Sequence, residues 1–396
     1  MTERERALDL LRRIDRESRY ATITLLGESG FVRTIVLGVL RWRSRLDQAI
    51  ETFAERKISK LDPLVVDVLR AGIYQLHFMD VAAYAAVSES VDAAPKRARG
   101  FVNAILRRAT KGLPEPPDVA TKYAHPKWLF DRWARTYGEM RAIAIMEANQ
   151  QLSYPDVLAL DAAPPAPAVP SSLVPDVYRL EGSTADLDRA MFYPMDEGSA
   201  VIAHIAAQCG RGLQPAEPRT EVRGHTGILD MAAAPGGKTL YMQHRGATVT
   251  SSDISISRLR SLTGRQPRLL VADGRQPPFR KRFSVVLLDA PCSATGTIRK
   301  NPEIKWRLRE SDLGPFAALQ KEMLASALKI ADDAVVYSTC SLEVEENDAV
   351  VAGFDRDDIT PHVPEGARKW VEDGVLRLTP DSGADGFTAF LLRGSR

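Results

Sequence analysis

The sequence predicts an all-α N-terminal domain followed by an α/β Rossmann-like domain with a mostly parallel, doubly wound sheet. Up to about residue 110, apolar side chains recur every three or four residues, which is the period of an amphipathic helix. From about residue 201, short apolar runs alternate with helix-like segments, which is typical of βαβ units. With 396 residues, 44% of them hydrophobic, the chain is long enough for two or three domains.

The first predicted domain, residues 1–112, is a series of helices. Asp62-Pro63 predicts the start of one of them, because proline is favoured at the first helical position. The glycine- and proline-rich stretch 112–118 ends the series. The apolar positions that define these helices are Leu8, Leu11, Ile14, Phe31, Ile35, Val39, Leu64, Val68, Leu69, Ile73, Val102, Ile105 and Leu106.

Residues 121–195 are predicted to form a helical and proline-rich connecting region. Helical patches cover Lys127–Tyr137 and 142–148, and the proline- and alanine-rich stretch 161–175 is expected to be a linker or a loosely structured connection. The third predicted domain spans 196–396. Its strands are expected at 226–230, 247–253, 268–273, 283–289 and 334–338, with a helix over 312–330.

Composition narrows the class of protein. The first residues are charged and lack an apolar core segment, so we expect no secretory signal. No apolar run approaches the ~18 residues that span a membrane. The three cysteines, at 209, 292 and 340, form no CxxC pair, and the six histidines are scattered. We expect a cytoplasmic monomer without disulfides or a metal site.

Charge alone does not indicate the partner. The net charge of +2 is too small to imply nucleic acid. Its distribution is uneven, because residues 1–112 hold 20 Lys and Arg against 14 Asp and Glu. An ordinary solvated helical surface explains this excess as well as RNA binding does.

The stretch LDMAAAPGGKT (229–239) has the form of a strand, a tight turn and the start of a helix. Gly236 and Gly237 lack the Cβ that would keep a ligand from the backbone, and the helix N-terminus offers N–H groups to an anion. Asp253 and Asp273 end the next two predicted strands, where a Rossmann-like fold places a carboxylate against ribose hydroxyls. Each aspartate alone fits a turn or a helix cap equally well. The absence of GxGxxG disfavours a dinucleotide.

Cys292 and Cys340 each follow an apolar, strand-like run, in FSVVLLDAPCS and AVVYSTCS. Adjacent strands lie ~4.8 Å apart, so two thiols leaving neighbouring strand ends can face one small substrate. Methylation of carbon 5 of a cytosine is one of the few metal-free reactions that require this arrangement. A lone cysteine is more often a small buried apolar residue, which is the expected role of Cys209.

The motifs AAPGGKT, LLDAPCSATGTIRKNPEIKW and VYSTCSLEVEEN resemble those of the S-adenosylmethionine-dependent RNA cytosine-5 methyltransferases. Some bacterial members of this family, the 16S rRNA methyltransferases (Sun/Fmu, RsmB-like), carry a NusB-like RNA-binding domain. Two N-terminal stretches are similar to that domain, VLGVLRWRSRLDQAI (36–50) and AVSESVDAAPKRARGFVNAILRRA (86–109). The resemblance implies methyl transfer to carbon 5 of a cytosine in small-subunit rRNA, through a covalent adduct between cysteine and carbon 6. The alternatives are the same reaction on tRNA or another RNA, or a catalytically inactive RNA-binding assembly factor.

The same resemblance implies roles for matching residues. Cys340 would be the nucleophile, and Cys292 would assist proton removal or product release, although spacing alone does not decide which sulfur attacks. Asp289 is expected to hydrogen-bond the base, and Lys238 or backbone N–H groups to activate the thiol. S-adenosylmethionine would contact Ala232, Ala233, Ala234, Pro235, Gly236, Gly237, Lys238, Asp253, Asp273 and Asp289.

Two groups of basic residues are candidates for contacts with RNA phosphates. The target base must be unstacked to reach a pocket, which is least costly in single-stranded RNA. After the Cys292 loop the candidates are Arg299, Lys300, Lys305 and Arg307, together with Trp306, and a solvated charged loop is the alternative. In the first domain they are Arg41, Arg43, Arg45, Lys96, Arg97, Arg99, Arg107 and Arg108, each of which singly fits an ordinary surface role.

Overall fold

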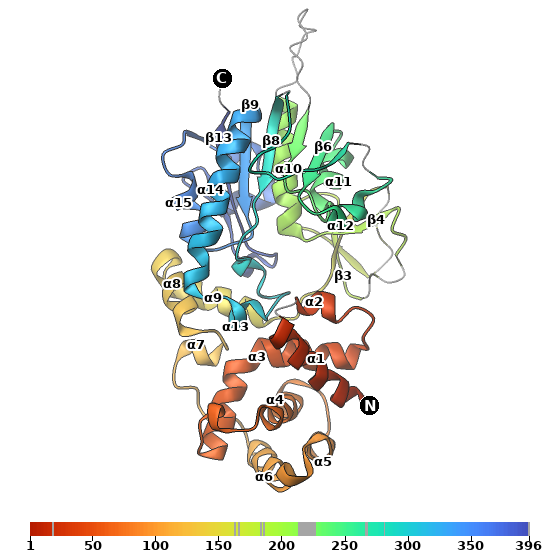
Figure 1. The fold of residues 1–396 in the computed structure, drawn as a ribbon, viewed down its shortest axis with the longest axis vertical. Helices are drawn as coiled ribbons and strands as arrows, with labels where there is room; N and C mark the ends of the chain where they lie inside the picture. Colours follow the sequence, from red (N-terminus) through yellow and green to blue (C-terminus); the bar gives the residue numbers. More distant parts are fainter. Residues whose placement is uncertain are drawn as a thin grey trace, which may run out of the picture. The chain divides into compact units, whose positions relative to one another are not determined.

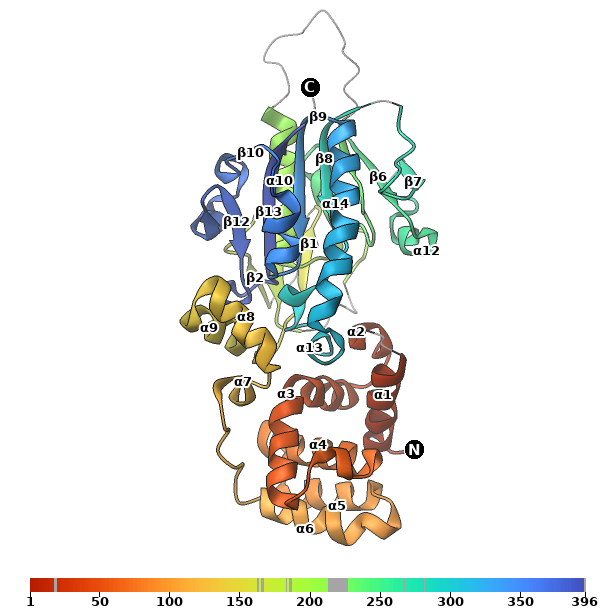
Figure 2. The same cartoon turned by 60° about the vertical axis from the view of Figure 1, so that its left-hand side comes forward.

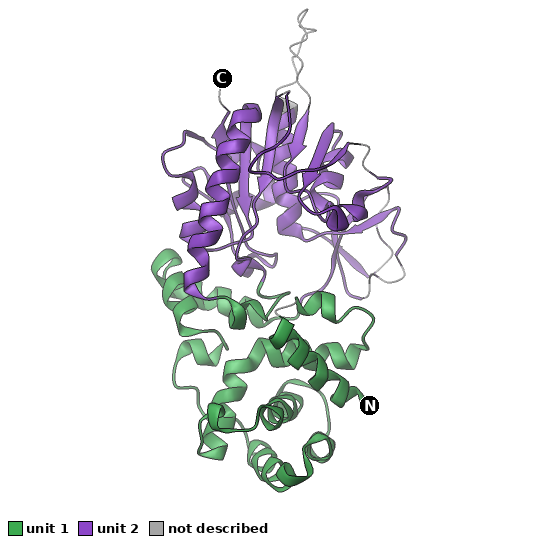
Figure 3. Cartoon of the chain, in the orientation of Figure 1, with its two compact units in different colours: residues 1–152, 298–308 green, residues 153–297, 309–396 purple. Residues whose placement is uncertain are grey.

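The computed structural model describes residues 1–17, 20–161, 164, 167–182, 184, 187–212, 227–265, 268–280 and 282–394. The chain forms two compact units (Figure 3). Unit 1 comprises Met1–Leu152 and Ile298–Leu308, and unit 2 comprises Ser153–Thr297 and Arg309–Arg396. The expected domains 1–112, 121–195 and 196–396 divide the chain at other positions, and nothing in the local sequence of residues 298–308 indicates that this late segment belongs to the first unit.

Unit 1 is built from helices (Figure 1). The Asp62 side chain accepts a hydrogen bond from the Leu64 N–H at 3.0 Å, and Pro63 begins a helix as predicted. All the predicted apolar positions are buried in the helical core except Phe31 and Leu64, which are partly buried. The helices are α1 (Glu3–Glu17), α2 (Ala21–Thr24), α3 (Gly30–Ala54), α4 (Pro63–Phe78), α5 (Ala83–Ala93), α6 (Arg99–Ala109), α7 (Val119–Lys122), α8 (Lys127–Tyr137), α9 (Glu139–Gln150) and α13 (Ile304–Arg307).

Helices α3 and α4 approach each other closely at Gly38, where an added Cβ would overlap the Tyr74 ring. We expect Gly38→Ala to destabilise the protein by about 1–3 kcal/mol, because the buried ring would have to move. Gly30→Ala is the matched control, since Gly30 lies in the first turn of the same helix with no neighbouring atom within 4 Å of an added Cβ. Thermal unfolding measures the difference, and equal midpoints for the two variants would contradict the close approach.

The main sheet of unit 2 has the strand order β11-β12-β13-β9-β8-β5-β6-β7, with β10 paired to β13. Strands β5 to β9 pair in parallel, as predicted, and β9 pairs antiparallel with β13. The antiparallel edge of β10 to β13 was not predicted. The strands are β5 (Ile228–Asp230), β6 (Val249–Asp253), β7 (Leu269–Val271), β8 (Phe283–Asp289), β9 (Ala331–Thr339), β10 (Arg356–Asp357), β11 (Val371–Glu372), β12 (Val375–Leu378) and β13 (Phe387–Arg393).

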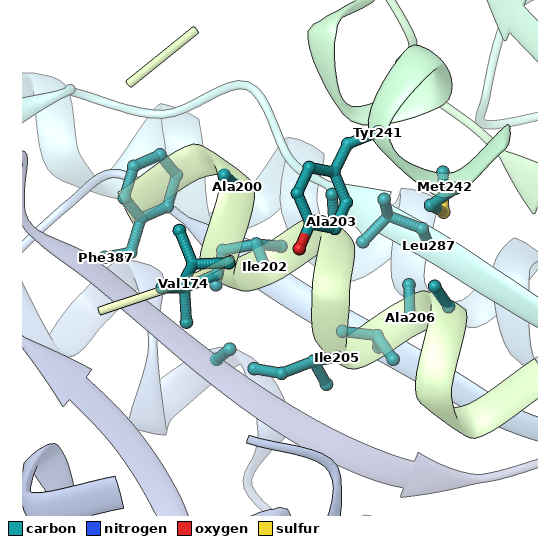
Figure 4. Packing of buried hydrophobic residues seen from close by; sticks show 14 of the residues in the cluster. Val174, Ala200, Ile202, Ala203, Ile205, Ala206, Tyr241, Met242, Leu287 and Phe387 are labelled. Atoms are coloured by element: carbon teal, nitrogen blue, oxygen red, sulfur yellow. The ribbon is translucent and has the colours of Figure 1, made fainter. Parts of the chain in front are cut away.

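Helices cover both faces of this sheet (Figure 2). Val285 and Leu287 of β8 belong to the core cluster that includes α10 (Glu197–Gly212) and α11 (Gly237–His244). Val286 and Leu288 belong to the cluster on the other face, with α14 (Leu313–Ile330). Figure 4 shows Leu287 among side chains of α10 and α11. Because both faces are buried, β8 has a nearly continuous apolar sequence before its final aspartate.

A smaller antiparallel sheet, also in unit 2, was not predicted. Its order is β2-β3-β1-β4, formed by β1 (Asp156–Ala159), β2 (Ala168–Pro170), β3 (Val177–Leu180) and β4 (Phe192–Pro194). Strand β2 lies within the proline-rich stretch that was expected to be a linker. It is an edge strand, where proline is tolerated because one side of the strand needs no donor.

The strand order reverses direction between β5 and β8, so the carboxyl ends of these strands border the crevice where doubly wound folds bind ligands. Short helices follow this edge, α12 (Ile256–Leu259) after β6 and α15 (Asp348–Val351) after β9. Among the described residues, no helix combines the length and apolar character needed to cross a bilayer.

Candidate active site

The two thiols that were predicted to leave neighbouring strands lie side by side. Strands β8 and β9 pair in parallel with Asp289 opposite Ser338, and the loop that follows each strand carries one cysteine. The Sγ atoms of Cys292 and Cys340 are 3.3 Å apart, and both side chains are partly buried. A single small substrate can therefore meet both sulfurs.

Backbone hydrogen bonds hold the two cysteine loops together. The Ala290 N–H donates to the Ser338 carbonyl at 2.8 Å, and the Gly296 N–H donates to the Cys340 carbonyl at 2.9 Å. The Gly386 N–H, just before β13, donates to the Gly296 carbonyl at 2.8 Å. A Cβ at Gly296 would overlap the Gly386 carbonyl, so glycine is required at this crossing of three segments.

An ion pair lies beside the thiols. Lys238, in the first turn of α11, places its Nζ 2.7 Å from Asp289 Oδ2, and Ser338 Oγ donates to Asp289 Oδ1 at 2.9 Å. Burial alone would lower the pKa of Lys238, but the Asp289 carboxylate outweighs burial and raises it, with smaller contributions from Asp230 and Cys340. Lys238 is therefore a stable positive charge within electrostatic reach of Cys340.

The surroundings of Cys292 favour its protonated form. A hydrogen bond to Cys340, burial, and the negative charges of Glu346 and Asp289 raise the pKa of Cys292 well above its usual value. Thiols in such surroundings keep their proton at neutral pH. The pair thus contains one thiol held in its protonated form and one that faces a lysine.

A second carboxyl group, Asp230, ends strand β5 near the ion pair. Burial raises its pKa to about 6, against the opposing effects of the Thr239 hydrogen bond and of Lys238, while Asp289 and Asp253 raise it further. The carboxyl ends of β5, β6 and β8 therefore bring three aspartates and Lys238 together. The sequence placed Asp230 at a strand end but gave it no role.

The loop predicted to bind the cofactor runs from residue 232 into α11. Its Ala234 N–H donates to Asp253 Oδ2 at 3.2 Å, and Ser255 N–H donates to Oδ1 at 2.9 Å, so Asp253 supports the loop from the end of β6. Gly236 has a φ of +115°, and an added Cβ would overlap Leu262. At Gly237 an added Cβ would make only ordinary contacts at 3.4 Å. Gly236 is thus the residue that fixes the turn.

Asp273 lies apart from the buried carboxylates. It follows β7 by two residues, and the neighbouring Ala272 N–H donates to the Asp253 carbonyl at 3.1 Å. Its own carboxylate pairs with Arg275, with Nη2 2.7 Å from Oδ2. Asp273 therefore lies near the end of β6, with a partly exposed carboxylate that pairs with Arg275.

The basic segment that was predicted to face RNA after the Cys292 loop is largely part of the core of unit 1. Lys305 is fully buried, and its Nζ donates to the carbonyl oxygens of Arg41 at 2.7 Å and Ala124 at 2.8 Å. Burial holds the pKa of Lys305 well below its usual value, and Arg41 lowers it further. The interpretation of Lys305 as a phosphate ligand is therefore wrong.

Three further residues of this segment also make contacts within unit 1. Trp306 Nε1 donates to the Leu40 carbonyl at 2.6 Å, and the carbonyl of buried Arg299 accepts from Arg41 Nη2 at 3.0 Å. The guanidinium of Arg307 lies 4.1 Å from the ring centroid of Tyr20. Residues 298–308 are thus anchored to α2 and α3 by contacts within unit 1.

The basic surface of the first domain is smaller than predicted. Arg41 and Arg45 are buried, and Arg43 pairs with Asp15 at 2.8 Å. Arg99 is partly buried, and its Nη2 donates to a carbonyl at 2.9 Å. The predicted candidates that are exposed are Lys96, Arg97, Arg107 and Arg108.

Sequence reasoning missed a buried polar group behind the thiols. Glu346, in the 3₁₀ turn Val344–Glu346, is fully buried and accepts hydrogen bonds from both cysteine loops. The feature of the sequence that could have indicated this buried carboxylate is the acidic pair Glu345-Glu346, which follows STCS. It was not used, because two consecutive glutamates ordinarily indicate a solvated turn.

Comparison with known proteins gives two family matches. Residues 217–391 match the family described as 16S rRNA methyltransferase RsmB/F, and residues 1–111 match the NusB family. The chain is 31% identical over 400 residues to the ribosomal RNA small subunit methyltransferase B of Xylella fastidiosa (strain 9a5c), which covers 92% of each chain. It is 31% identical over 362 residues to the protein of the same name from Escherichia coli O127:H6, covering 83% of this chain and 82% of the relative.

Solved structures share the fold. The crystal structure of PH0851 superposes with a TM-score of 0.72 at 22% identity, over 99% of this chain and 98% of that one. A methyltransferase homologue from Pyrococcus horikoshii superposes with a TM-score of 0.52 at 23% identity, over 71% of this chain and all of its own. These similarities bear out the predicted α/β fold of the C-terminal part.

Proposed function

The chain belongs to the RsmB/F family of 16S rRNA methyltransferases, and from this membership we propose that it methylates carbon 5 of a cytosine in small-subunit rRNA. The methyl donor of the family is S-adenosylmethionine. The observation that carries the proposal is the pair of thiols, 3.3 Å apart, beside the Lys238–Asp289 ion pair. The three cysteines are free thiols, which suits the reducing cytoplasm where we place the reaction.

The residues present fit S-adenosylmethionine. Within the described residues, the buried Oδ1 of Asp230 has no hydrogen-bond partner, so it can accept one from the ammonium of a methionine moiety. Asp253 accepts one N–H on each oxygen and keeps lone pairs for ribose hydroxyls. The turn at Gly236 leads into the N-terminus of α11, whose backbone N–H groups suit a carboxylate. When bound, the cofactor supplies an electrophilic methyl group on its sulfonium sulfur.

Cys340 is the proposed nucleophile. Its thiolate adds to carbon 6 of the cytosine, and the electron pair of the carbon 5–carbon 6 double bond then makes carbon 5 nucleophilic enough to take the methyl group. Lys238 favours the thiolate by its positive charge. Asp289 accepts a hydrogen bond from the amidine edge of the base, which stabilises the protonated, more electrophilic ring.

Cys292 is proposed to act in the second half of the reaction. After methylation, a solvent water takes the proton of carbon 5, the electrons of that C–H bond restore the carbon 5–carbon 6 double bond, and the carbon 6–sulfur bond breaks, so that its electron pair returns to the Cys340 sulfur. Cys292 lies against Cys340 and holds a proton, so it can assist this release by donating a hydrogen bond to the departing sulfur. The assignment of the attacking sulfur to Cys340 follows from the match of its STCS motif to the family, and the raised pKa of Cys292 suits a thiol that keeps its proton.

A methyl-transfer assay with tritiated S-adenosylmethionine tests the proposal. We expect incorporation into unmodified small-subunit rRNA and none into tRNA, with the label at carbon 5 of one cytosine by bisulfite sequencing. Label in tRNA alone would replace the proposed substrate. No incorporation into any RNA, with S-adenosylmethionine bound, would favour an inactive assembly factor.

A further inference from the structure

The carboxylate of Glu346 lies behind the thiol pair and contacts both cysteine loops. Its Oε1 accepts from the Ser293 N–H at 2.8 Å, and its Oε2 accepts from Ser341 Oγ at 2.5 Å and also from Ser293 Oγ. The two serine hydroxyls lie 3.1 Å from each other. Ser293 directly follows Cys292 and Ser341 directly follows Cys340, so one carboxylate binds the residue after each thiol.

A glutamine on α14 completes this arrangement. Gln320 is fully buried, and its Nε2 donates to Glu346 Oε1 at 3.0 Å and to the Pro291 carbonyl at 2.8 Å. The residues before and after Cys292 are therefore both tied to the Glu346–Gln320 pair. A buried carboxylate with four donors is well satisfied, and such networks fix a single geometry.

Glu346 also contributes charge. The groups that act on Cys292 are Cys340 from the loop after β9, Glu346 from the following 3₁₀ turn and Asp289 at the end of β8, while Lys238 of α11 faces Asp289 and Cys340. A buried negative charge behind a thiol disfavours its thiolate. Position and charge of Glu346 thus act on the same sulfur.

We propose that Glu346 is a positioning residue, which holds Cys292 and Cys340 in register through Ser293 and Ser341. The proposal rests on the proposed function, because it assumes that the two thiols act in turn on one base. Glu346 touches neither the base nor the cofactor in this scheme. Its effect passes through the two serines and through its charge.

Two variants separate position from charge. Glu346→Asp keeps the charge but shortens the side chain, so the serine contacts are lost or strained. Glu346→Gln keeps the length and removes the charge, and the serine hydroxyls can rotate to meet its amide. Glu345→Gln is the matched control, since it makes the same change at the adjacent, only partly buried residue.

The effect of the Glu346 charge can be measured without RNA. The rate of alkylation by iodoacetamide is followed at each cysteine by mass spectrometry over a range of pH, which gives the midpoint for each thiol. We expect Glu346→Gln to lower the midpoint for Cys292 by about one pH unit, because the opposing charge is gone. Glu346→Asp and Glu345→Gln should leave this midpoint in place. A purely structural role would not shift it, so an unchanged midpoint in Glu346→Gln would overturn the role of the charge.

Steady-state methylation kinetics test whether Glu346 positions the two cysteine loops. We expect Glu346→Asp to lower kcat about 100-fold with an unchanged KM for S-adenosylmethionine, since a misplacement of about 1 Å has that effect. Wild-type kcat in Glu346→Asp would overturn the positioning role. If that variant does not fold, Ser341→Ala replaces it, and we expect its kcat to fall about tenfold. A wild-type kcat in Ser341→Ala would again contradict the positioning role. Failure of the wild type to methylate cytosine would contradict the proposed function instead, and the alkylation profiles would still test the charge.

Discussion

Cys340→Ala is expected to abolish methylation, and Cys292→Ala to trap a covalent complex between protein and RNA. Without the Cys340 sulfur no bond to carbon 6 forms, so the rate should fall by about 10⁴-fold or more. Without Cys292 the adduct still forms through Cys340, but its release loses the neighbouring thiol. The trapped complex should survive a denaturing gel.

The measurement is a gel shift with labelled rRNA, together with tritium incorporation from the methyl donor. Cys209→Ala is the control, because Cys209 is buried in α10, where burial raises its pKa to about 12. It should methylate like the wild type and give no stable complex. A stable complex from Cys340→Ala, and none from Cys292→Ala, would reverse the two roles.

The second large effect is expected at the cofactor turn, where Gly236→Ala should weaken S-adenosylmethionine binding at least about tenfold. A residue with a Cβ pays roughly 1–2 kcal/mol in a left-handed backbone, and here the Cβ would also overlap Leu262. The turn must then adopt another conformation, which moves the N-terminus of α11 away from its ligand.

Gly237→Ala is the matched control for this turn. Its φ is not in the left-handed range, and its added Cβ would contact Met195 and Tyr193 at 3.4 Å. Isothermal titration with S-adenosylmethionine should therefore show a much smaller loss for Gly237→Ala than for Gly236→Ala. Similar losses for both would mean that the ligand needs the space at both glycines and that turn geometry is not decisive.

The parallel part of the sheet could be predicted from the sequence because strands that are buried on both faces have short, nearly continuous apolar sequences. Strand β8 was expected at 283–289 and spans those residues, since both of its faces are covered and an aspartate ends the run. The meeting of Cys292 and Cys340 followed from the same logic, as parallel neighbours end at one edge. The antiparallel edge strands and the small sheet are short, so they carry little periodicity.

Other features depend on contacts between distant residues. The local sequence of Lys305 is typical of a surface residue. Lys305 is nevertheless buried, because carbonyl oxygens of α3 and of the segment before α8 accept hydrogen bonds from its Nζ. Glu346 reads as part of a solvated acidic turn, yet it is buried because donors from three segments surround it. The local sequence around such residues fits a solvated surface equally well, so it does not indicate their burial.

The membership of residues 298–308 in unit 1 has a consequence for how this protein can be divided. The polypeptide passes from one unit to the other three times, so no single cleavage yields two intact halves. A fragment lacking the first 152 residues would retain Lys305 and Trp306 but not the carbonyl groups that accept hydrogen bonds from these side chains. The two units are thus connected through three chain crossings, unlike modules joined by a single linker.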